Sequence, residues 1–327
     1  MTLVIGTDEA GYGPNLGPLV IGATAWQVDA PPERAETILE EAVGHALAST
    51  QPPIVWRDSK EVYRGGAGRD LLLTSALAAV GIAHGCVPGG WRDLAAVLTH
   101  IAPAEGDASP EWQALAGVSL LEDDHAQAVT AAAAELAERL TARGVRLSAI
   151  RCRCLYPGTF NRLIDSGLNK SDILSRETLA LAAGLAGELG TADAPTRIWC
   201  DRHGGRKRYA GVIAAAFGVQ AEPLEETPQC SAYRLGRGGL FAGPPATETI
   251  LEFSVQGERR PPVAVASLTA KSVRELAMEQ FNRFWCDQQP ELAPTAGYPV
   301  DASRWRDEAT PALERLGVDP AQVWRQV

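Results

Sequence analysis

The N-terminal segment of the chain places two carboxylates between two apolar runs. Leu3 to Thr7 is short and rich in β-branched residues, and Leu19 to Trp26 is a second apolar run. The stretch from Gly11 to Pro18 between them consists largely of turn residues. This pattern predicts a β-hairpin with an elaborate connection, and Asp8 and Glu9 stand where its first strand ends.

Asp8 and Glu9 are candidates for a shared site, with one geometric condition. Neighbouring residues on a strand point to opposite faces, so both can serve one site only if the strand twists or ends there. Gly11 and Gly13 supply the freedom for that. A solvated hairpin turn explains the same residues equally well. A glycine-rich phosphate loop is a weaker interpretation, because the glycine spacing fits neither the Walker nor the dinucleotide-binding motif.

Strands and helices alternate through the rest of the chain, which predicts an α/β fold with a mixed sheet. The stretch 263–284 is strand-like at first and then helical, and one or two short helices follow Pro290. We expect further strands at 145–155, 197–201, 219–222 and 249–255, and helices at 31–49, 68–80, 111–143, 206–217 and before Gly190.

The composition is that of a globular chain. Its 327 residues, 46% apolar and 21% charged, can bury a core of good size. The N-terminus lacks the basic and long apolar regions of a signal peptide, and acidic residues interrupt the apolar runs well short of a membrane span. We therefore expect a cytoplasmic monomer that contacts no membrane. We expect one main domain over residues 1–290 and a helical extension over 291–327 packed on it.

The six cysteines are scattered, with no Cys-x-x-Cys pair and no second ligand pair at finger-like spacing. Reduced core thiols are therefore expected rather than disulfides or a zinc site.

The net charge of −10 argues against bulk attraction to nucleic acid but not against a local basic groove. Arg202, Arg206, Lys207 and Arg208 form the densest basic run, which can steer a phosphate backbone or simply form a solvated helix start. For 169–171, which contains Lys170, a helix cap is the favoured interpretation over a nucleic-acid contact.

Two later segments also carry candidate groups. Asp201 ends an apolar run that should be buried, and a carboxylate there needs a partner or a metal unless it begins a turn. Lys271 and Glu275 stand at i and i+4 and share a helix face, where a surface salt bridge is the simpler explanation. His203 is a less favoured proton donor, because a lone histidine is seldom catalytic.

Five segments together resemble the type 2 ribonuclease H family, the ribonucleases HII and HIII. The family's Asp-Glu-Ala-Gly-Arg-Gly-Pro, Asp-Ser-Lys, strand-ending Asp, Ala-Ser-Ile-x-Ala-Lys-x-x-Arg-Asp and Gly-Tyr motifs occur in family order. They are matched by Asp8-Glu-Ala-Gly-Tyr-Gly-Pro14 (with Gly17-Pro18 following), Asp58-Ser59-Lys60, Asp201, Ala266-Ser-Leu-Thr-Ala-Lys-Ser-Val-Arg-Glu275 and Gly297-Tyr298.

The resemblance implies a ribonuclease H-like mixed β-sheet flanked by helices, with the first strand beside the strand of Asp201. Asp8, Glu9, Asp201 and Glu275 would then be catalytic and hold two Mg²⁺ or Mn²⁺ ions, which prefer oxygen ligands. The implied activity is an endoribonuclease that cuts the RNA strand of RNA–DNA hybrids, or DNA at embedded ribonucleotides, and leaves 5′-phosphate and 3′-hydroxyl ends.

The resemblance also assigns contacts to the nucleic acid. The backbone amides of Gly11, Tyr12 and Gly13 would read the 2′-hydroxyl that distinguishes RNA from DNA. An aromatic ring at Tyr298 would stack on deoxyribose near the scissile nucleotide. Ser59, Lys60 and Lys271 complete the contacts expected at this site.

The sequence departs from the family at three places. Tyr12 stands where the family has Arg or Lys, which removes a phosphate contact although the ring can stack. Glu275 replaces Asp, as in ribonuclease HIII, and an insertion lies at about 223–262. A nuclease of this fold with another nucleic-acid substrate is therefore an alternative, and so is a non-catalytic nucleic-acid-binding protein. The four retained acids argue against the latter.

Overall fold

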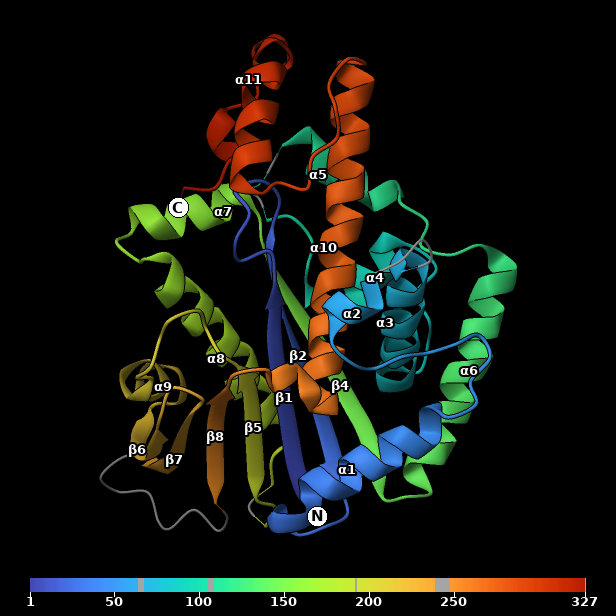
Figure 1. Ribbon diagram of the computed structural model, residues 1–327, viewed down its shortest axis with the longest axis vertical. Helices are drawn as coiled ribbons and strands as arrows, with labels where there is room; N and C mark the ends of the chain where they lie inside the picture. The colour runs from blue at the N-terminus through green and yellow to red at the C-terminus, as the bar shows by residue number, and fades with distance from the viewer. Residues whose placement is uncertain (64–67, 105–106, 108, 192, 239–247, 327) are drawn as a thin grey trace.

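The computed structural model spans residues 1–327 and describes all of them except 64–67, 105–106, 108, 192, 239–247 and 327. Its centre is one eight-stranded sheet with the order β3-β4-β2-β1-β5-β8-β7-β6 (Figure 1). The strands are β1 Thr2–Ala10, β2 Leu19–Val28, β3 Thr99–His100, β4 Val145–Leu155, β5 Thr196–Asp201, β6 Val219–Glu226, β7 Cys230–Gly238 and β8 Thr249–Ser254. The predicted α/β class with a mixed sheet flanked by helices is confirmed.

The pairing of the central strands sets where their carboxylates lie. β1 is antiparallel to β2 and parallel to β5, with Thr7 opposite Cys200. β5 is in turn parallel to β8. Because β1 and β5 run in the same direction, Asp8 and Asp201 come at the same edge of the sheet. The expectation that the first strand lies beside the strand of Asp201 is therefore confirmed.

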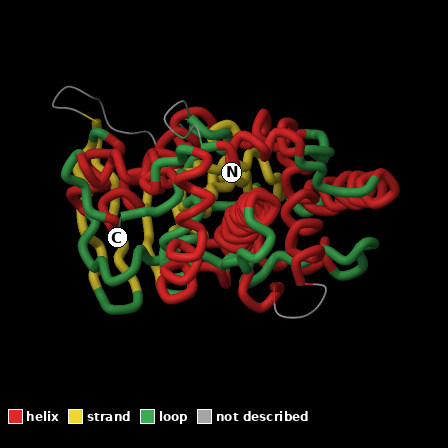
Figure 2. The backbone as a smooth tube through the Cα atoms, turned by 90° about the horizontal axis from the view of Figure 1, so that it is seen from above, coloured by secondary structure: helices red, strands yellow, loops and turns green. Residues whose placement is uncertain are grey.

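Helices cover both faces of the sheet and gather around the strands in the view from above (Figure 2). They are α1 Pro32–Leu47, α2 Ser59–Tyr63, α3 Gly68–His84, α4 Trp91–Leu98, α5 Pro110–Gln113, α6 Asp123–Thr141, α7 Pro157–Asp165, α8 Lys170–Leu189, α9 Ala210–Phe217, α10 Pro261–Gln288 and α11 Pro299–Leu316. Short 3-10 turns are η1 Ala114–Gly117, η2 Gly257–Arg259 and η3 Pro320–Gln322.

The strand β1 is apolar on both sides because it is covered on both sides. Val4 packs into the core beneath α1, α3, α6 and α10, whereas Leu3 and Ile5 pack into the second core beneath α8 and α9. Alternate side chains of a strand point to opposite faces, so a buried central strand is continuously apolar. This explains why the run before Asp8 contains no polar alternation.

Two predicted helices are wrong in their extent, and one strand is missing from the prediction. The stretch 111–143 is not one helix: it divides into α5, η1 and α6, and α6 begins at Asp123, where acidic residues favour a helix N-terminus. The helix predicted at 206–217 begins only at Ala210, because a basic run opposes the positive end of a helix. The strand β7 was not predicted.

The start of α10 is helical rather than strand-like. Pro261 and Pro262 occupy its first turn, where a missing backbone N–H costs nothing. The β-branched residues Val263 and Val265, which suggested a strand, are fully buried in the core instead. Tertiary packing overrides the local preference of these residues.

Two glycines let α10 lie directly against β1 and β2. A Cβ at Gly6 would stand 2.3 Å from the carbonyl carbon of Pro262, and one at Gly22 would stand 2.4 Å from the carbonyl oxygen of Ala266. Real side chains do not approach backbone atoms so closely. The hydroxyl of Thr24 also donates to the Pro262 carbonyl at 2.8 Å. This close approach carries the following turns of α10 to the end of β1.

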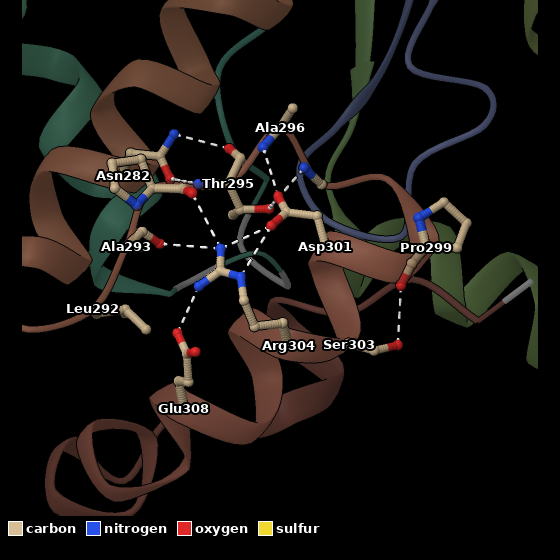
Figure 3. A network of polar contacts seen from close by, with 12 residues as sticks. Asn282, Leu292, Ala293, Thr295, Ala296, Pro299, Asp301, Ser303, Arg304 and Glu308 are labelled. Carbon is tan, nitrogen blue, oxygen red and sulfur yellow. Dashed lines mark hydrogen bonds and ion pairs between the residues drawn. The ribbon is translucent and has the colours of Figure 1, made fainter.

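The C-terminal segment packs on α10 mainly through one helix, the 18-residue α11. Its Trp305 ring lies 4.9 Å from Phe281 and 5.5 Å from Trp285, both on α10. Figure 3 shows the polar network at the entry to α11, in which Asp301 accepts hydrogen bonds from Thr295 at 2.6 Å and from Arg304 at 2.8 Å. These contacts fix the turn that precedes α11.

The predicted insertion at 223–262 contains β7, β8 and η2, and its residues 239–247 lie outside the described part. All six cysteines are free, and Cys152, Cys154 and Cys200 are core residues as predicted, whereas Cys86 is exposed and Cys230 and Cys286 are only partly buried. Among the described helices, none combines the length and apolar character that crossing a membrane requires.

We predict that Gly22→Ala lowers the free energy of unfolding by about 1–3 kcal/mol, because its Cβ would collide with the backbone of α10. Urea denaturation measures the change. Gly44→Ala is the matched control, since a Cβ at this helical position meets nothing within 4 Å and should stabilise α1 by up to about 1 kcal/mol. Equal effects of the two substitutions would contradict the close packing of α10.

Candidate active site

A cavity of about 230 Å³ opens where β1, β5 and α10 meet. Asp8, Glu9, Asp201 and Glu275 all line it, so the structure brings the four predicted acids around one space. Its other lining residues are Ala10, Gly11, Asp58, Ser59, Lys60, Glu258, Ser267, Lys271, Arg274 and Tyr298. Two further cavities, of about 470 and 390 Å³ beside β4, contain one carboxylate between them, that of Asp29.

Asp8 and Glu9 both reach the cavity although the strand does not end between them. β1 stays paired with β2 as far as Ala10, opposite Val20. The backbone N–H of Glu9 donates to the Asp8 carboxylate at 2.8 Å, which turns that side chain along the strand. Of the two predicted alternatives, that the strand twists or that it ends there, the second is therefore wrong, and both side chains nevertheless line one space.

The three carboxylates at the sheet edge resist ionisation. Burial raises the pKa of Glu9 to about 7, and the charge of Asp201 adds to this. Burial also raises the pKa of Asp201 to about 6. The pKa of Asp8 is raised well above its ordinary value by burial and then by the charges of Glu9 and Asp201. Clustered carboxylates without a nearby cation behave in this way.

Glu258 is a further acid of the cavity wall, which sequence reasoning missed. It lies on η2, in the segment that follows β8, and its charge and hydrogen bond help to raise the pKa of Asp201. The N–H of the preceding Gly257 donates to the Asp201 carboxylate at 2.9 Å. A Cβ at Gly257 would stand 3.1 Å from the Asp201 Cα atom, so the turn lies tight against β5. No motif in the sequence signalled this acid.

Glu275 enters the cavity from α10 and is oriented by a second missed residue. The hydroxyl of Tyr63, on α2, donates to Glu275 Oε2 at 3.0 Å. The Lys271 ammonium lies 4.3 Å from the centre of the Tyr63 ring. Lys271 and Glu275 therefore share the face of α10 that lines the cavity, and Tyr63 of α2 contacts both of them.

The Asp58-Ser59-Lys60 segment contributes from the start of α2. The Ser59 and Ser267 hydroxyls lie 3.1 Å apart, within hydrogen-bond distance, and a hydrogen bond donated by Ser267 partly offsets the raised pKa of Asp8. Lys60 lines the cavity, and its charge partly offsets the raised pKa of Glu9. A hydroxyl pair thus links α2 and α10 to the acid on β1.

The three residues of the predicted Gly11-Tyr12-Gly13 contact lie in different surroundings in the structure. Gly11 lines the cavity, whereas Tyr12 turns toward Gly204 and the Lys170 ammonium, which lies 4.7 Å from the centre of its ring. Gly13 lies beside the ring of Tyr298, which is 60% exposed at the rim. Tyr12 is therefore not part of the cavity wall.

Two buried arginines hold the loop that carries these glycines. Arg325, fully buried, donates to the carbonyls of Gly11, at 2.6 Å, and Pro14. Arg274 donates to Pro18 at 2.5 Å and to Leu16 at 3.1 Å. Burial lowers the pKa of Arg274 to about 10. Arg274 lay in a matched motif, but only its neighbours were predicted as site residues.

Arg202 and Arg206 of the basic run after Asp201 serve the fold, whereas Lys207 and Arg208 are exposed. Arg202 donates to the carbonyls of Arg206 and Thr227, at 3.1 and 3.2 Å. Arg206 pairs with Asp172 on α8. His203 is buried against Ser175, and burial lowers its pKa to about 3. A neutral, enclosed imidazole is not placed to donate a proton to a substrate.

The carboxylates fit a hard divalent cation by their chemistry. Asp8, Glu9 and Asp201 supply oxygen donors, and their raised pKa values show a local excess of negative charge that a cation would relieve. Within the described residues, no three acidic, histidine or cysteine side chains converge in a metal-binding arrangement. The donors are present, whereas their convergence on an ion is not preformed.

Several solved ribonuclease H structures are similar to this chain. The ribonuclease H2 of Pyrococcus horikoshii OT3 is 16% identical, with 98% of this chain and 92% of that one covered and a TM-score of 0.45. The RNase HII of Archaeoglobus fulgidus, in a complex with PCNA, is 15% identical over 99% and 94%, with a TM-score of 0.40. Bst-RNase HIII with Mn²⁺ is 13% identical over 100% and 66%, with a TM-score of 0.45.

The sequence matches no protein-family model and no curated protein sequence.

The raised pKa of Glu9 predicts a pH-dependent cost in stability. An acid whose pKa is higher in the folded chain holds an extra proton there, so the free energy of unfolding falls as pH rises from 4.5 to about 7. Glu9→Gln removes this loss. With a chelator present, the free energy of unfolding of Glu9→Gln should rise relative to that of the parent between pH 4.5 and about 7. Above this range the difference should stay constant.

Denaturation by urea at several pH values measures this difference. Glu138→Gln, on the exposed side of α6, is the control and should show no such trend. A Glu9→Gln advantage that is constant with pH, or that shrinks as pH rises, would contradict the raised pKa.

Proposed function

We propose that this protein is a metal-dependent nuclease that cleaves the RNA strand of RNA–DNA hybrids, or DNA at embedded ribonucleotides. The observation that carries the proposal is the single cavity to which β1, β5 and α10 each contribute a predicted acid. Residues far apart in the sequence, each in a motif of the type 2 ribonuclease H pattern, meet there. The sequence resemblance supplies the substrate class.

The charge distribution favours a nuclease over a passive nucleic-acid-binding protein. A protein that only binds a phosphate backbone gains nothing from Asp8, Glu9 and Asp201 at the contact, because like charges repel. Their burial raises the cost further, as the raised pKa values show. Divalent cations convert the same cluster from a repulsive to an attractive site for phosphate.

In this proposal Asp8, Glu9, Asp201 and Glu275 hold two Mg²⁺ or Mn²⁺ ions. Such a pair, when bound, supplies activation of the attacking water and stabilisation of the leaving 3′ oxygen of a phosphodiester, which leaves 5′-phosphate and 3′-hydroxyl ends. Tyr63 orients Glu275, the Gly257 N–H orients Asp201, and Ser267 orients Asp8.

Glu258 is proposed as an additional carboxylate beside Asp201. It lies against that residue and lines the cavity, so it can position Asp201. Lys60 and Lys271 would contact the phosphates on either side of the scissile bond, since both line the same space.

Discrimination of RNA is proposed to lie at the rim of the cavity. The backbone at Gly11 and Gly13 is positioned by Arg325, and Gly13 lies next to the exposed Tyr298 ring. Backbone amides can read a 2′-hydroxyl, and a ring can stack on the neighbouring sugar. The position of Tyr12 outside the cavity favours, as a second candidate, the same chemistry on another nucleic acid.

A cleavage assay tests the proposal. Labelled duplexes with an RNA strand, with one ribonucleotide, all DNA and all RNA are incubated with Mg²⁺ or Mn²⁺. We predict ribonucleotide-dependent cleavage that falls by more than about 100-fold in Asp8→Asn, since even outer partners of a metal are worth about 10- to 100-fold. Glu258→Gln should fall by about 10- to 100-fold.

Glu138→Gln is the control for this assay and should cleave as the parent does. Equal cleavage of the all-DNA duplex would contradict the requirement for RNA and favour the second candidate, the same chemistry on another nucleic acid. Tight binding of the hybrid without cleavage at any metal concentration would overturn the nuclease proposal.

A further inference from the structure

Lys170 occupies an unusual position for a lysine. It is the first residue of the 20-residue helix α8, whose cap Asn169 accepts a hydrogen bond from the Asp172 N–H at 2.9 Å. The amino end of a helix carries partial positive charge, so a cation there is unfavourable. Lys170 is also partly buried, which disfavours its charged form. The stability of α8 does not explain a lysine at this place.

The neighbours of Lys170 hold it without neutralising it. Its ammonium lies 4.7 Å from the centre of the Tyr12 ring, a cation–π contact. Burial is the larger cause that lowers the pKa of Lys170. In the described part of the chain, Arg325 is the one charged group that changes this pKa, and it lowers it further. The nearby Asp172 carboxylate is engaged by Arg206.

The surroundings add further positive charge. Arg325 is fully buried, and its Nε and one terminal nitrogen have no hydrogen-bond partner among the described residues. Burial and the charge of Glu9 raise the pKa of Tyr12, and the charge of Arg206, which is paired with Asp172, lowers it.

We propose that Lys170, supported on the Tyr12 ring, binds a backbone phosphate of the nucleic-acid strand as it leaves the acidic cavity. This inference rests on the proposed nucleic-acid substrate. Tyr12 directly follows Gly11 of the cavity wall, so the contact between Lys170 and Tyr12 lies one residue along the chain from that wall. Among the described residues no carboxylate pairs with this ammonium, so it is free to pair with phosphate, and the aromatic support limits its motion.

Binding by an inactive protein tests this proposal. The Asp8→Asn protein, with and without Lys170→Ala, is titrated with a labelled RNA–DNA hybrid and an all-DNA duplex over a range of salt concentrations. Loss of one phosphate contact should weaken binding of both about five- to tenfold at 0.1 M salt and reduce the salt slope by about one. Lys170→Arg should retain binding.

A charge swap makes the test specific. Tyr12→Arg combined with Lys170→Ala moves the cation from the helix to the loop and should restore binding to within about twofold of the parent. Tyr12→Leu keeps the lysine but removes its support, and should give an intermediate loss. Arg143→Ala is the matched control, because it removes one exposed charge at the opposite end of the sheet, where β4 begins.

Thermal melting separates contact from folding. Because the helix end and Arg325 both disfavour the Lys170 charge, the melting temperature of Lys170→Ala should equal or exceed that of the parent. Weaker binding together with a lower melting temperature would show a structural role and overturn the proposal. So would unchanged binding, or an equal loss in Arg143→Ala.

The outcomes also distinguish the two proposals. If the parent cleaves no substrate but Lys170→Ala still weakens binding with a lower salt slope, the phosphate contact stands and the nuclease assignment fails. If the parent cleaves and Lys170→Ala binds as the parent does, the nuclease stands and the phosphate contact is overturned.

Discussion

The contact of α10 with β1 and β2 through two glycines determines the rest of the site. Without side chains at Gly6 and Gly22, the helix backbone lies against the strands, and its second turn reaches the end of β1. A helix held at the usual distance by side chains would carry Glu275 away from Asp8 and Glu9. The pairing of β1 with β5 then adds Asp201 to the same edge. The geometry of the cavity follows from backbone packing.

This arrangement concentrates negative charge that the fold must support. The pKa values of Asp8, Glu9 and Asp201 are all raised, first by burial. The hydroxyl of Ser267 and the Gly257 N–H reduce the cost but do not remove it. Functional sites commonly retain such perturbed groups at the expense of stability. The same reasoning applies to Lys170, which is placed against the helix dipole and beside a cationic arginine.

Local pattern was enough for the central strands of the sheet, two of which carry acids of the cavity. β1, β2, β4 and β5 were predicted because buried strands are continuously apolar and are bounded by turn residues. The start of α10 was not, because its packing against glycine overrides the strand preference of Val263 and Val265. The four acids could be grouped from their motifs. Glu258 and Arg325 could not, since each reaches the site through a tertiary path that no local pattern encodes.

The central claim is that the acids of β1, β5 and α10 bind divalent ions in this cavity. Anomalous diffraction from crystals grown with Mn²⁺ tests it most directly. We predict two manganese peaks about 3.5–4 Å apart, bound by Asp8, Glu9, Asp201 and Glu275. Manganese bound elsewhere, or a cavity without anomalous signal at saturating Mn²⁺, would contradict it.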